Sequence, residues 1–144
     1  MTKLFMVSEI EIFIDTSGFK ALLDKNDAFF TQVWALWPKL QNSPSARLVT
    51  SNYILDESFT LIRLRCGLQV AMDLQDMISK SSMSISIERV TTEDEKDAWE
   101  WFQNDWSKLS FTDCTSFALM KRLEITRVVT FDEHFKRAGF VPEH

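Results

Sequence analysis

Residues 10–17 read IEIFIDTS, and residues 127–135 read RVVTFDEHF. In the first stretch isoleucines alternate with other side chains up to Asp15. In the second, Phe131 alone separates the short run RVVT (127–130) from Asp132. Alternating or continuous apolar runs of this length are typical of buried strands. The two stretches therefore predict two strands of one sheet, each followed by an acid at its carboxyl end.

Working outward, the rest of the chain alternates between the two kinds of pattern. Apolar runs predict further strands over 47–50, 83–90 and 139–142, and helical spacing predicts helices over 18–24, 26–40, 52–65, 68–80, 92–106, 111–123 and 133–138. Gly67 is a plausible stop between two helices, and Thr92 can cap the next one. Strands that alternate with helices predict an α/β fold in three layers, with a central parallel sheet of four to five strands flanked by helices.

Length and composition suit one globular domain. The chain has 144 residues, 45% of them hydrophobic, which is enough for one buried core, and we expect a single domain over 1–144. The net charge of −5 excludes a protein that grips nucleic acid through a broad basic surface. It does not exclude a nuclease, because bound metal ions can also meet the charge of a phosphate.

The two cysteines and the start of the chain indicate the compartment. Cys66 and Cys114 fit neither a disulfide framework nor a zinc site, which indicates a reducing environment. Glu9 and Glu11 interrupt the early apolar stretch before it could serve as a signal peptide. No window approaches the roughly 18 apolar residues of a membrane span. We therefore expect a cytoplasmic protein without a membrane segment.

Two acids lie where ligands of parallel sheets bind, a third lies in the first turn of a predicted helix, and each also has an ordinary explanation. Asp15 and Asp132 fall at the carboxyl edge of the predicted sheet. Both could instead cap the helices that follow them. Asp113 with Ser110 resembles a capping box at the start of a helix. Taken singly, these positions leave a binding role and a capping role open.

Glu57 is harder to explain as a surface acid. It shares a helix face with Ile54, Leu61 and Leu64 by the three-four spacing, so it lies within an apolar stripe. Burying a lone carboxylate is costly unless it is paired or bound to a metal. The alternative to a metal ligand is an arginine partner.

If these four acids converge, their mutual repulsion requires a counter-charge. Mg²⁺ or Mn²⁺ is the natural answer, since such cations prefer carboxylates, waters and phosphate oxygens. A cation held in this way can orient water for in-line attack on phosphorus and stabilise the leaving oxygen. Phosphodiester hydrolysis is the reaction that fits this arrangement.

Four strings then carry a family resemblance. FIDTS (13–17), SNYILDESFTLIR (51–63), LSFTDCTSFALMKRL (109–123) and VVTFDEHFKRAGF (128–140) resemble, in order, the four acidic motifs of PIN-domain ribonucleases. The resemblance spans nearly the whole chain and implies a PIN-like fold, with catalytic and metal-binding roles for Asp15, Glu57, Asp113 and Asp132. It also implies that the hydroxyls of Thr16, Ser110 and Thr130 support the site.

PIN-domain proteins of this size resemble VapC-like toxins. The resemblance implies an endoribonuclease that leaves a 5′-phosphate and a 3′-hydroxyl, a paired antitoxin protein as its inhibitor, and a homodimer. Arg63 and Lys136 are candidates for binding RNA phosphates. Trp99, Phe102 and Trp106 share a predicted helix face, which serves either core packing or a dimer or partner interface.

The sequence also bears on other chemistries and functions. His134 and His144 do not form a positioned acid–base pair in the sequence, and Cys114 fits a small buried residue better than a nucleophile. A stand-alone PIN nuclease and a non-catalytic PIN module that binds RNA or protein remain alternatives. A phosphoacceptor receiver domain would need a pair of adjacent acids after the first strand, and FIDTS does not supply it.

Overall fold

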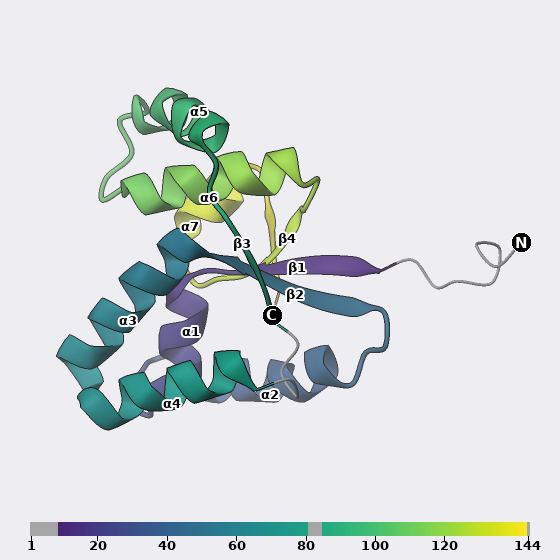
Figure 1. The fold of residues 1–144 in the computed structure, drawn as a ribbon, viewed down its shortest axis with the longest axis vertical. Helices are drawn as coiled ribbons and strands as arrows, with labels where there is room; N and C mark the ends of the chain where they lie inside the picture. Colours follow the sequence, from purple (N-terminus) through teal and green to yellow (C-terminus); the bar gives the residue numbers. More distant parts are fainter. Residues whose placement is uncertain (1–8, 81–84, 144) are drawn as a thin grey trace, which may run out of the picture.

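The computed structural model describes residues 9–80 and 85–143 of the chain. Its centre is a sheet of five parallel strands in the order β3-β2-β1-β4-β5 (Figure 1). The strands are β1 (Ile10–Ile14), β2 (Ala46–Ser51), β3 (Ile85–Glu88), β4 (Arg127–Val129) and β5 (Val141–Pro142). The expectation of a parallel sheet of four to five strands is therefore confirmed.

Helices cover both faces of this sheet, as the three-layer expectation required. On one face lie α1 (Thr16–Leu23), α2 (Phe30–Gln41), α3 (Asn52–Cys66) and α4 (Leu68–Ser79). On the other lie α5 (Thr92–Phe102), α6 (Phe111–Arg122) and α7 (Glu133–Arg137), with α5 packed outside α6 (Figure 1). Parallel neighbours require such crossover helices, because the chain must return to the same end of the sheet before each strand.

The strand order places the ends of β1 and β4 side by side. The chain moves outward from β1 to β2 and β3, then returns to add β4 on the other side of β1. The direction of winding reverses between β1 and β4, which is where open α/β sheets bind ligands beyond their strand ends. Phe13 and Ile14 of β1 are buried, so this central strand is held rigidly between the two helical layers.

Aromatic packing holds the second helical layer on the sheet. The ring of Phe117 in α6 contacts Trp101, Trp106, Phe135 and Phe140, with centroid distances of 5.2, 6.5, 5.0 and 5.8 Å. Phe117 is fully buried, and so is Phe135. This cluster joins α5, α6 and α7, so it positions the two helix starts that carry site residues.

Two helix boundaries differ by four residues from the sequence prediction. The helix expected from residue 26 begins at Phe30, because the carboxyl groups of Asp24 and Asp27 accept hydrogen bonds from the backbone two residues later and form turns. The helix expected to reach residue 106 ends at Phe102, where Asn104 donates both its backbone N–H and its side-chain amide to the Trp101 carbonyl.

The early end of α5 changes one further expectation. Trp106 lies beyond the helix and turns back toward Trp101, with ring centroids 6.2 Å apart. The prediction that it shares a helix face with Trp99 and Phe102 is therefore wrong, and Trp99 and Phe102 are exposed on α5. Thr91, one residue before the predicted cap, closes the capping box of this helix with Asp94.

Some predictions fall partly outside the described residues. The expected strand over 83–90 is seen as 85–88, while residues 83 and 84, like His144, lie outside them. Of the helices in the described ranges, not one combines the length and apolar character needed to cross a membrane. Gly67 ends α3, as predicted, and its φ of 93° is a backbone conformation that favours glycine.

Gly18 allows α1 to approach the end of β4. A Cβ atom at this position would lie 2.7 Å from the carbonyl oxygen of Val129 and 3.1 Å from a side-chain carbon of Ile14. The nearer contact is with backbone and is too short for a real side chain, and the contact with Ile14 is tight enough that its side chain would have to shift. A glycine is therefore required where the first turn of α1 meets both strands.

We expect the substitution Gly18→Ala to destabilise the fold. Overpacking costs about 1–3 kcal/mol, which outweighs the gain of up to about 1 kcal/mol that alanine has over glycine in a helix. Urea unfolding followed by circular dichroism measures this difference. An increase in the free energy of unfolding, the usual result for glycine to alanine in an open helix, would contradict the close approach.

Candidate metal centre

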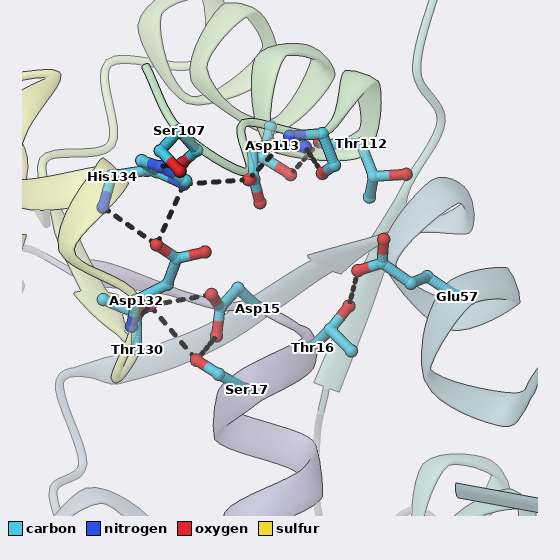
Figure 2. Close-up of polar contacts among 12 residues, drawn as sticks. Asp15, Thr16, Ser17, Glu57, Ser107, Thr112, Asp113, Thr130, Asp132 and His134 are labelled. Carbon is cyan, nitrogen blue, oxygen red and sulfur yellow. Dashed lines mark hydrogen bonds and ion pairs between the residues drawn. The ribbon is translucent and has the colours of Figure 1, made fainter. Parts of the chain in front are cut away.

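Asp15 lies between the ends of the two central strands. It is 3% exposed and caps α1, with its Oδ1 accepting hydrogen bonds from the Gly18 N–H at 2.9 Å and the Ser17 hydroxyl at 2.8 Å. Its Oδ2 accepts a hydrogen bond from the Thr130 hydroxyl at 2.7 Å (Figure 2). The capping role weighed from the sequence is real, and the same carboxylate also joins β1 to the end of β4.

Ser17 and Thr130 build a short hydrogen-bond network around this carboxylate. The Ser17 oxygen accepts from the Phe131 N–H at 2.9 Å, and the Thr130 oxygen accepts from the Asp132 N–H at 3.0 Å. Each hydroxyl thus donates to Asp15 and accepts from the backbone beyond β4. The network sets the distance between α1 and the segment that carries Asp132.

Asp113 and Asp132 meet at His134. The Nδ1 atom of His134 lies 3.3 Å from Asp113 Oδ2 and 3.0 Å from Asp132 Oδ1 (Figure 2). One ligand atom from each of these three residues lies within 4.8 Å of the others. Asp113 comes from the first turn of α6 and Asp132 precedes α7, so two helix starts converge from opposite sides.

Glu57 approaches the same place from α3. Its Oε1 accepts a hydrogen bond from the Thr16 hydroxyl at the start of α1 (Figure 2). It makes no ion pair with an arginine in the described parts of the chain, so the alternative of an arginine partner is not supported. Glu57 lines one cavity of about 240 Å³ together with Asp15, Asp113 and Asp132. The four acids predicted from the sequence are therefore brought together.

The reason given for Glu57 is nevertheless wrong in part. Ile54 is buried, but Leu64 is 78% exposed, so the stripe of residues 54, 57, 61 and 64 is not buried along its length. Glu57 is half-buried at the wall of the cavity. It faces the site because α3 packs against α1, not because it is enclosed in the core.

In Asp113 and Asp132, the helix cap uses only one of the two carboxylate oxygens. The Oδ2 of Asp113 accepts from the Ser110 N–H at 3.2 Å, completing a capping box, and the Oδ1 of Asp132 accepts from the His134 N–H at 2.9 Å. The second oxygens of Asp113, Asp132 and Glu57 have no hydrogen-bond partner within residues 9–80 and 85–143. These oxygens remain available to a ligand.

Burial and repulsion raise the pKa values of two of the acids. Burial raises the pKa of Asp15 from 3.8 to about 7, although three hydrogen bonds oppose the shift, and the charge of Asp113 adds to it. Burial also raises the pKa of Asp113 to about 6, and the charges of Asp132 and Glu57 act in the same direction. The site therefore holds more negative charge than it can stabilise alone.

His134 is a member that the sequence reasoning missed. Its Nε2 lies 2.8 Å from the carbonyl oxygen of Ser107, which can only accept, so this nitrogen carries a proton. Its ring stacks near that of Trp106, with centroids 6.2 Å apart. Nδ1 is left facing two carboxylate oxygens, Asp113 Oδ2 and Asp132 Oδ1. The only signal in the sequence was a histidine two positions after Asp132.

The donor set fits a divalent cation. It offers carboxylate oxygens without hydrogen bonds and one imidazole nitrogen oriented by a backbone carbonyl, which is the usual second partner of a metal-binding histidine. The carboxylate oxygens suit Mg²⁺ and Mn²⁺, whereas an imidazole nitrogen is a ligand that suits transition metals. Asp113, Asp132 and His134 would hold the ion, with Asp15 and Glu57 at the same cavity.

Two lysines that the sequence reasoning did not select line this cavity. The ammonium group of Lys20 lies 3.0 Å from Asp24 and 2.8 Å from Asp27, so its charge is already matched. Lys108 is exposed and makes no ion pair in the part of the chain that the structure describes. Its φ of 62° is rare for a non-glycine residue and turns the loop that follows the Ser107 anchor.

Arg63 and Lys136, which were predicted to bind RNA phosphates, lie in different parts of the structure. Arg63 is exposed on α3 and is not among the residues that line the cavity, because it lies nearly two turns beyond Glu57. Lys136 lines a neighbouring cavity together with Asp132. Cys114 is buried and its pKa is raised to about 12, chiefly by burial, as expected of an inert packed thiol.

The fold and the site together define a class of protein. It is a parallel α/β protein, similar to a nuclease, in which acidic side chains converge where the direction of winding reverses between β1 and β4. Residues 12–141 match the family model described as PIN domain. The chain belongs to the PIN-domain family. Within that family it belongs to the VapC-like proteins, since it is 37% identical over 131 residues to the 23S rRNA-specific endonuclease VapC20 of Mycobacterium tuberculosis, covering 90% of this chain and 95% of that protein.

Solved structures agree with this assignment. The crystal structure of Mycobacterium tuberculosis VapC20, described as a Sarcin-Ricin loop cleaving toxin, is similar with a TM-score of 0.81 and 35% identity over 92% of this chain and 98% of that chain. VapBC2 from Rickettsia felis, bound to promoter DNA, has a TM-score of 0.68 at 14% identity, covering 93% and 98%. FitAcB from Neisseria gonorrhoeae has 0.62 at 16%, covering 92% and 96%. The last two show the shared fold alone.

The raised pKa of Asp15 predicts how stability depends on pH in EDTA. Its folded pKa of about 7 exceeds the ordinary 3.8, so its contribution is fully present below pH 3.8 and is lost as the pH rises through 7. We expect wild-type protein to lose about 2–4 kcal/mol more than Asp15→Asn over that range. Urea unfolding of both proteins at a series of pH values measures the difference.

Adding millimolar Mn²⁺ should reverse this loss, because a cation that binds only the folded state stabilises it by mass action. The effect should grow as the pH rises and the carboxyls give up their protons. Parallel stability curves for wild type and Asp15→Asn, with no shift on adding Mn²⁺, would rule out a charged site of this kind.

Proposed function

We propose that this chain is a metal-dependent endoribonuclease that hydrolyses RNA phosphodiester bonds and acts as the toxin of a toxin–antitoxin pair. The observation that carries the proposal is the set of ligand atoms of Asp113, Asp132 and His134 within 4.8 Å of one another, in one cavity with Asp15 and Glu57. Membership of the VapC-like PIN-domain proteins supports the same reaction.

Each acid has a proposed role in this reaction. Asp15, Glu57, Asp113 and Asp132 serve as metal ligands and catalytic carboxylates, with His134 as a further ligand. A bound Mg²⁺ or Mn²⁺ supplies Lewis-acid stabilisation of the phosphate and lowers the pKa of a coordinated water. The chain's own residues set where this happens, because their positions follow from the ends of β1 and β4 and the starts of α6 and α7.

The supporting hydroxyls orient these carboxylates. Thr16 donates to Glu57, and Thr130 donates to Asp15 at 2.7 Å, as proposed for these positions. Ser110 acts differently, since its backbone N–H contacts the Asp113 carboxylate while its hydroxyl accepts from the Asp113 N–H at 3.0 Å. Fixing one oxygen of Asp113, Asp132 and Glu57 leaves the other to contact the cation in a defined direction. Both oxygens of Asp15 already accept hydrogen bonds.

The substrate proposed is a loop of large-subunit ribosomal RNA. The support is the 37% identity to VapC20, a 23S rRNA-specific endonuclease that is also described as cleaving the Sarcin-Ricin loop. We propose further that the chain works as one domain in the cytoplasm, as a homodimer, and is inhibited by an antitoxin protein. The exposed rings of Trp99 and Phe102, which pack on the half-buried ring of Phe111, are available for such contacts.

Two alternatives stay distinguishable from this proposal. A stand-alone PIN nuclease would cleave RNA but have no small DNA-binding antitoxin encoded beside it. A non-catalytic module would bind RNA or protein and leave RNA intact at any metal concentration. The carboxylate oxygens of Asp113, Asp132 and Glu57 that accept no hydrogen bond favour the nuclease over the non-catalytic module. A module that only binds RNA or protein does not need free ligands for a metal ion.

The first test is cleavage of purified ribosomes or transcribed ribosomal RNA. We expect cleavage with Mg²⁺ or Mn²⁺, none in EDTA, and products with a 5′-phosphate and a 3′-hydroxyl. Asp113→Asn should lower the rate by more than about 100-fold, the upper effect of removing even outer partners of a metal site. Lys96→Gln on the exposed face of α5 is the control. Cleavage that continues unchanged in EDTA would defeat the metal mechanism.

Lys108 generates a second test. It is the lysine of the cavity whose charge is unmatched in the described residues, so we propose that it contacts the RNA phosphate during cleavage. Lys108→Gln should lower kcat/KM by about 10-fold or more, as expected for loss of a charge-assisted hydrogen bond. Steady-state cleavage at several salt concentrations measures this. Lys96→Gln should behave as wild type, and equal effects of both variants would assign Lys108 only to general surface charge.

A further inference from the structure

A second cavity lies directly beside the acidic one. It has a volume of about 270 Å³, and Asp132 lines both. Whatever occupies the second cavity therefore lies next to the phosphate that the acidic site would hold. Its walls differ in character, because they include two phenylalanine rings, an amide and a lysine.

The two rings form a stacked pair. Phe131 follows Thr130, and the Ser17 oxygen accepts a hydrogen bond from its backbone N–H, so the ring is positioned by the acidic site itself. Phe29, just before α2, stacks on it with ring centroids 4.4 Å apart and planes 8° apart. The Asp27 carboxylate fixes the Phe29 backbone through a hydrogen bond at 2.9 Å. This arrangement holds an aromatic ring rigidly at the surface.

Phe29 is 40% exposed despite its size. The exposed ring of Phe29 can stack with a nucleic-acid base, because aromatic side chains stack on bases of any identity. The polar wall residues agree with one nucleotide. Lys136 is exposed and forms no ion pair within 9–80 and 85–143, so it is available to a phosphate, and the Gln32 amide is exposed beside it.

The acids at this cavity narrow the choice of ligand. Asp132 and Glu133 also line it, so a free multiply charged anion would be repelled. A nucleotide within an RNA strand presents an uncharged base to the rings and a single negative charge per phosphate to Lys136. Its charge and its shape both match the lining better than those of an anionic metabolite.

We propose that this cavity, which we call the Phe29 subsite, binds one unpaired nucleotide of RNA adjacent to the cleaved phosphodiester. The base stacks on Phe29 and a flanking phosphate pairs with Lys136. The inference rests on the proposed ribonuclease function. It adds the consequence that the substrate nucleotide must be splayed out of its own helix, so loops and single strands are preferred over duplex RNA.

The test measures binding of a fluorescein-labelled oligouridylate by anisotropy, in an Asp113→Asn background that prevents cleavage. Phe29→Leu keeps an apolar side chain but removes the ring, and should weaken binding about 5- to 100-fold. Trp34→Leu is the control, because Trp34 of α2 is a 46% exposed aromatic residue that lines neither of the two cavities. It should bind as the background protein does.

The substitution Lys136→Gln provides a second test of binding. Because Lys136 is exposed, we expect this substitution to leave the fold intact. It should weaken binding and reduce the slope of log Kd against log salt concentration by roughly 0.7, the effect of losing one phosphate contact on a single strand. Lys96→Gln should leave the slope unchanged. A duplex of the same length should bind more weakly than the single strand, and should not respond to Phe29→Leu.

The outcomes separate this proposal from the proposed function. If wild-type protein cleaves RNA while Phe29→Leu and Lys136→Gln bind and cleave normally, the Phe29 subsite is wrong and the nuclease stands. If binding depends on Phe29 but no RNA is cleaved under any metal condition, the subsite stands and the nuclease does not. If Phe29→Leu changes only the oligomeric state in sedimentation, a second copy of the chain covers the rings, which overturns the proposal.

Discussion

Burial of the Asp15 carboxylate between the ends of β1 and β4, with the charge of Asp113 beside it, is the constraint on which the site depends. Asp15 is 3% exposed and its pKa rises to about 7, although it accepts hydrogen bonds from Gly18, Ser17 and Thr130. Groups that hydrogen-bond a carboxylate normally lower its pKa, so burial here outweighs three favourable contacts. A fold that maintains such a cluster creates a place where a divalent cation is stabilising.

The same carboxylates also start helices, and the two roles support each other. A helix cap fixes one oxygen through a backbone N–H, which orients the side chain and leaves the second oxygen facing the cavity. Asp113 and Asp132 both follow this arrangement. The capping and binding explanations weighed for each acid are therefore not alternatives, because the cap supplies the orientation that a metal ligand needs.

Much of the architecture could be predicted because it depends on local patterns. The alternation at 10–14 and the apolar run before Thr130 defined two strands, and Asp15, Asp113 and Asp132 fell at strand ends or helix starts. His134 could not be found in this way, because its role depends on Ser107 and Trp106, which reach it from a different segment. The early end of α5 was missed because one amide, at Asn104, decided it.

The sequence by itself determined the parallel α/β class, the order of the acids and the resemblance that names the family, since these rest on periodicity and on short motifs. Only the tertiary structure decided which side chains share a cavity. Glu57 shows the difference: its apolar neighbours suggested burial, but Leu64 is exposed, and Glu57 reaches the site because α3 packs on α1. Contacts between distant segments depend on how helices pack, and spacing along the chain does not specify that packing.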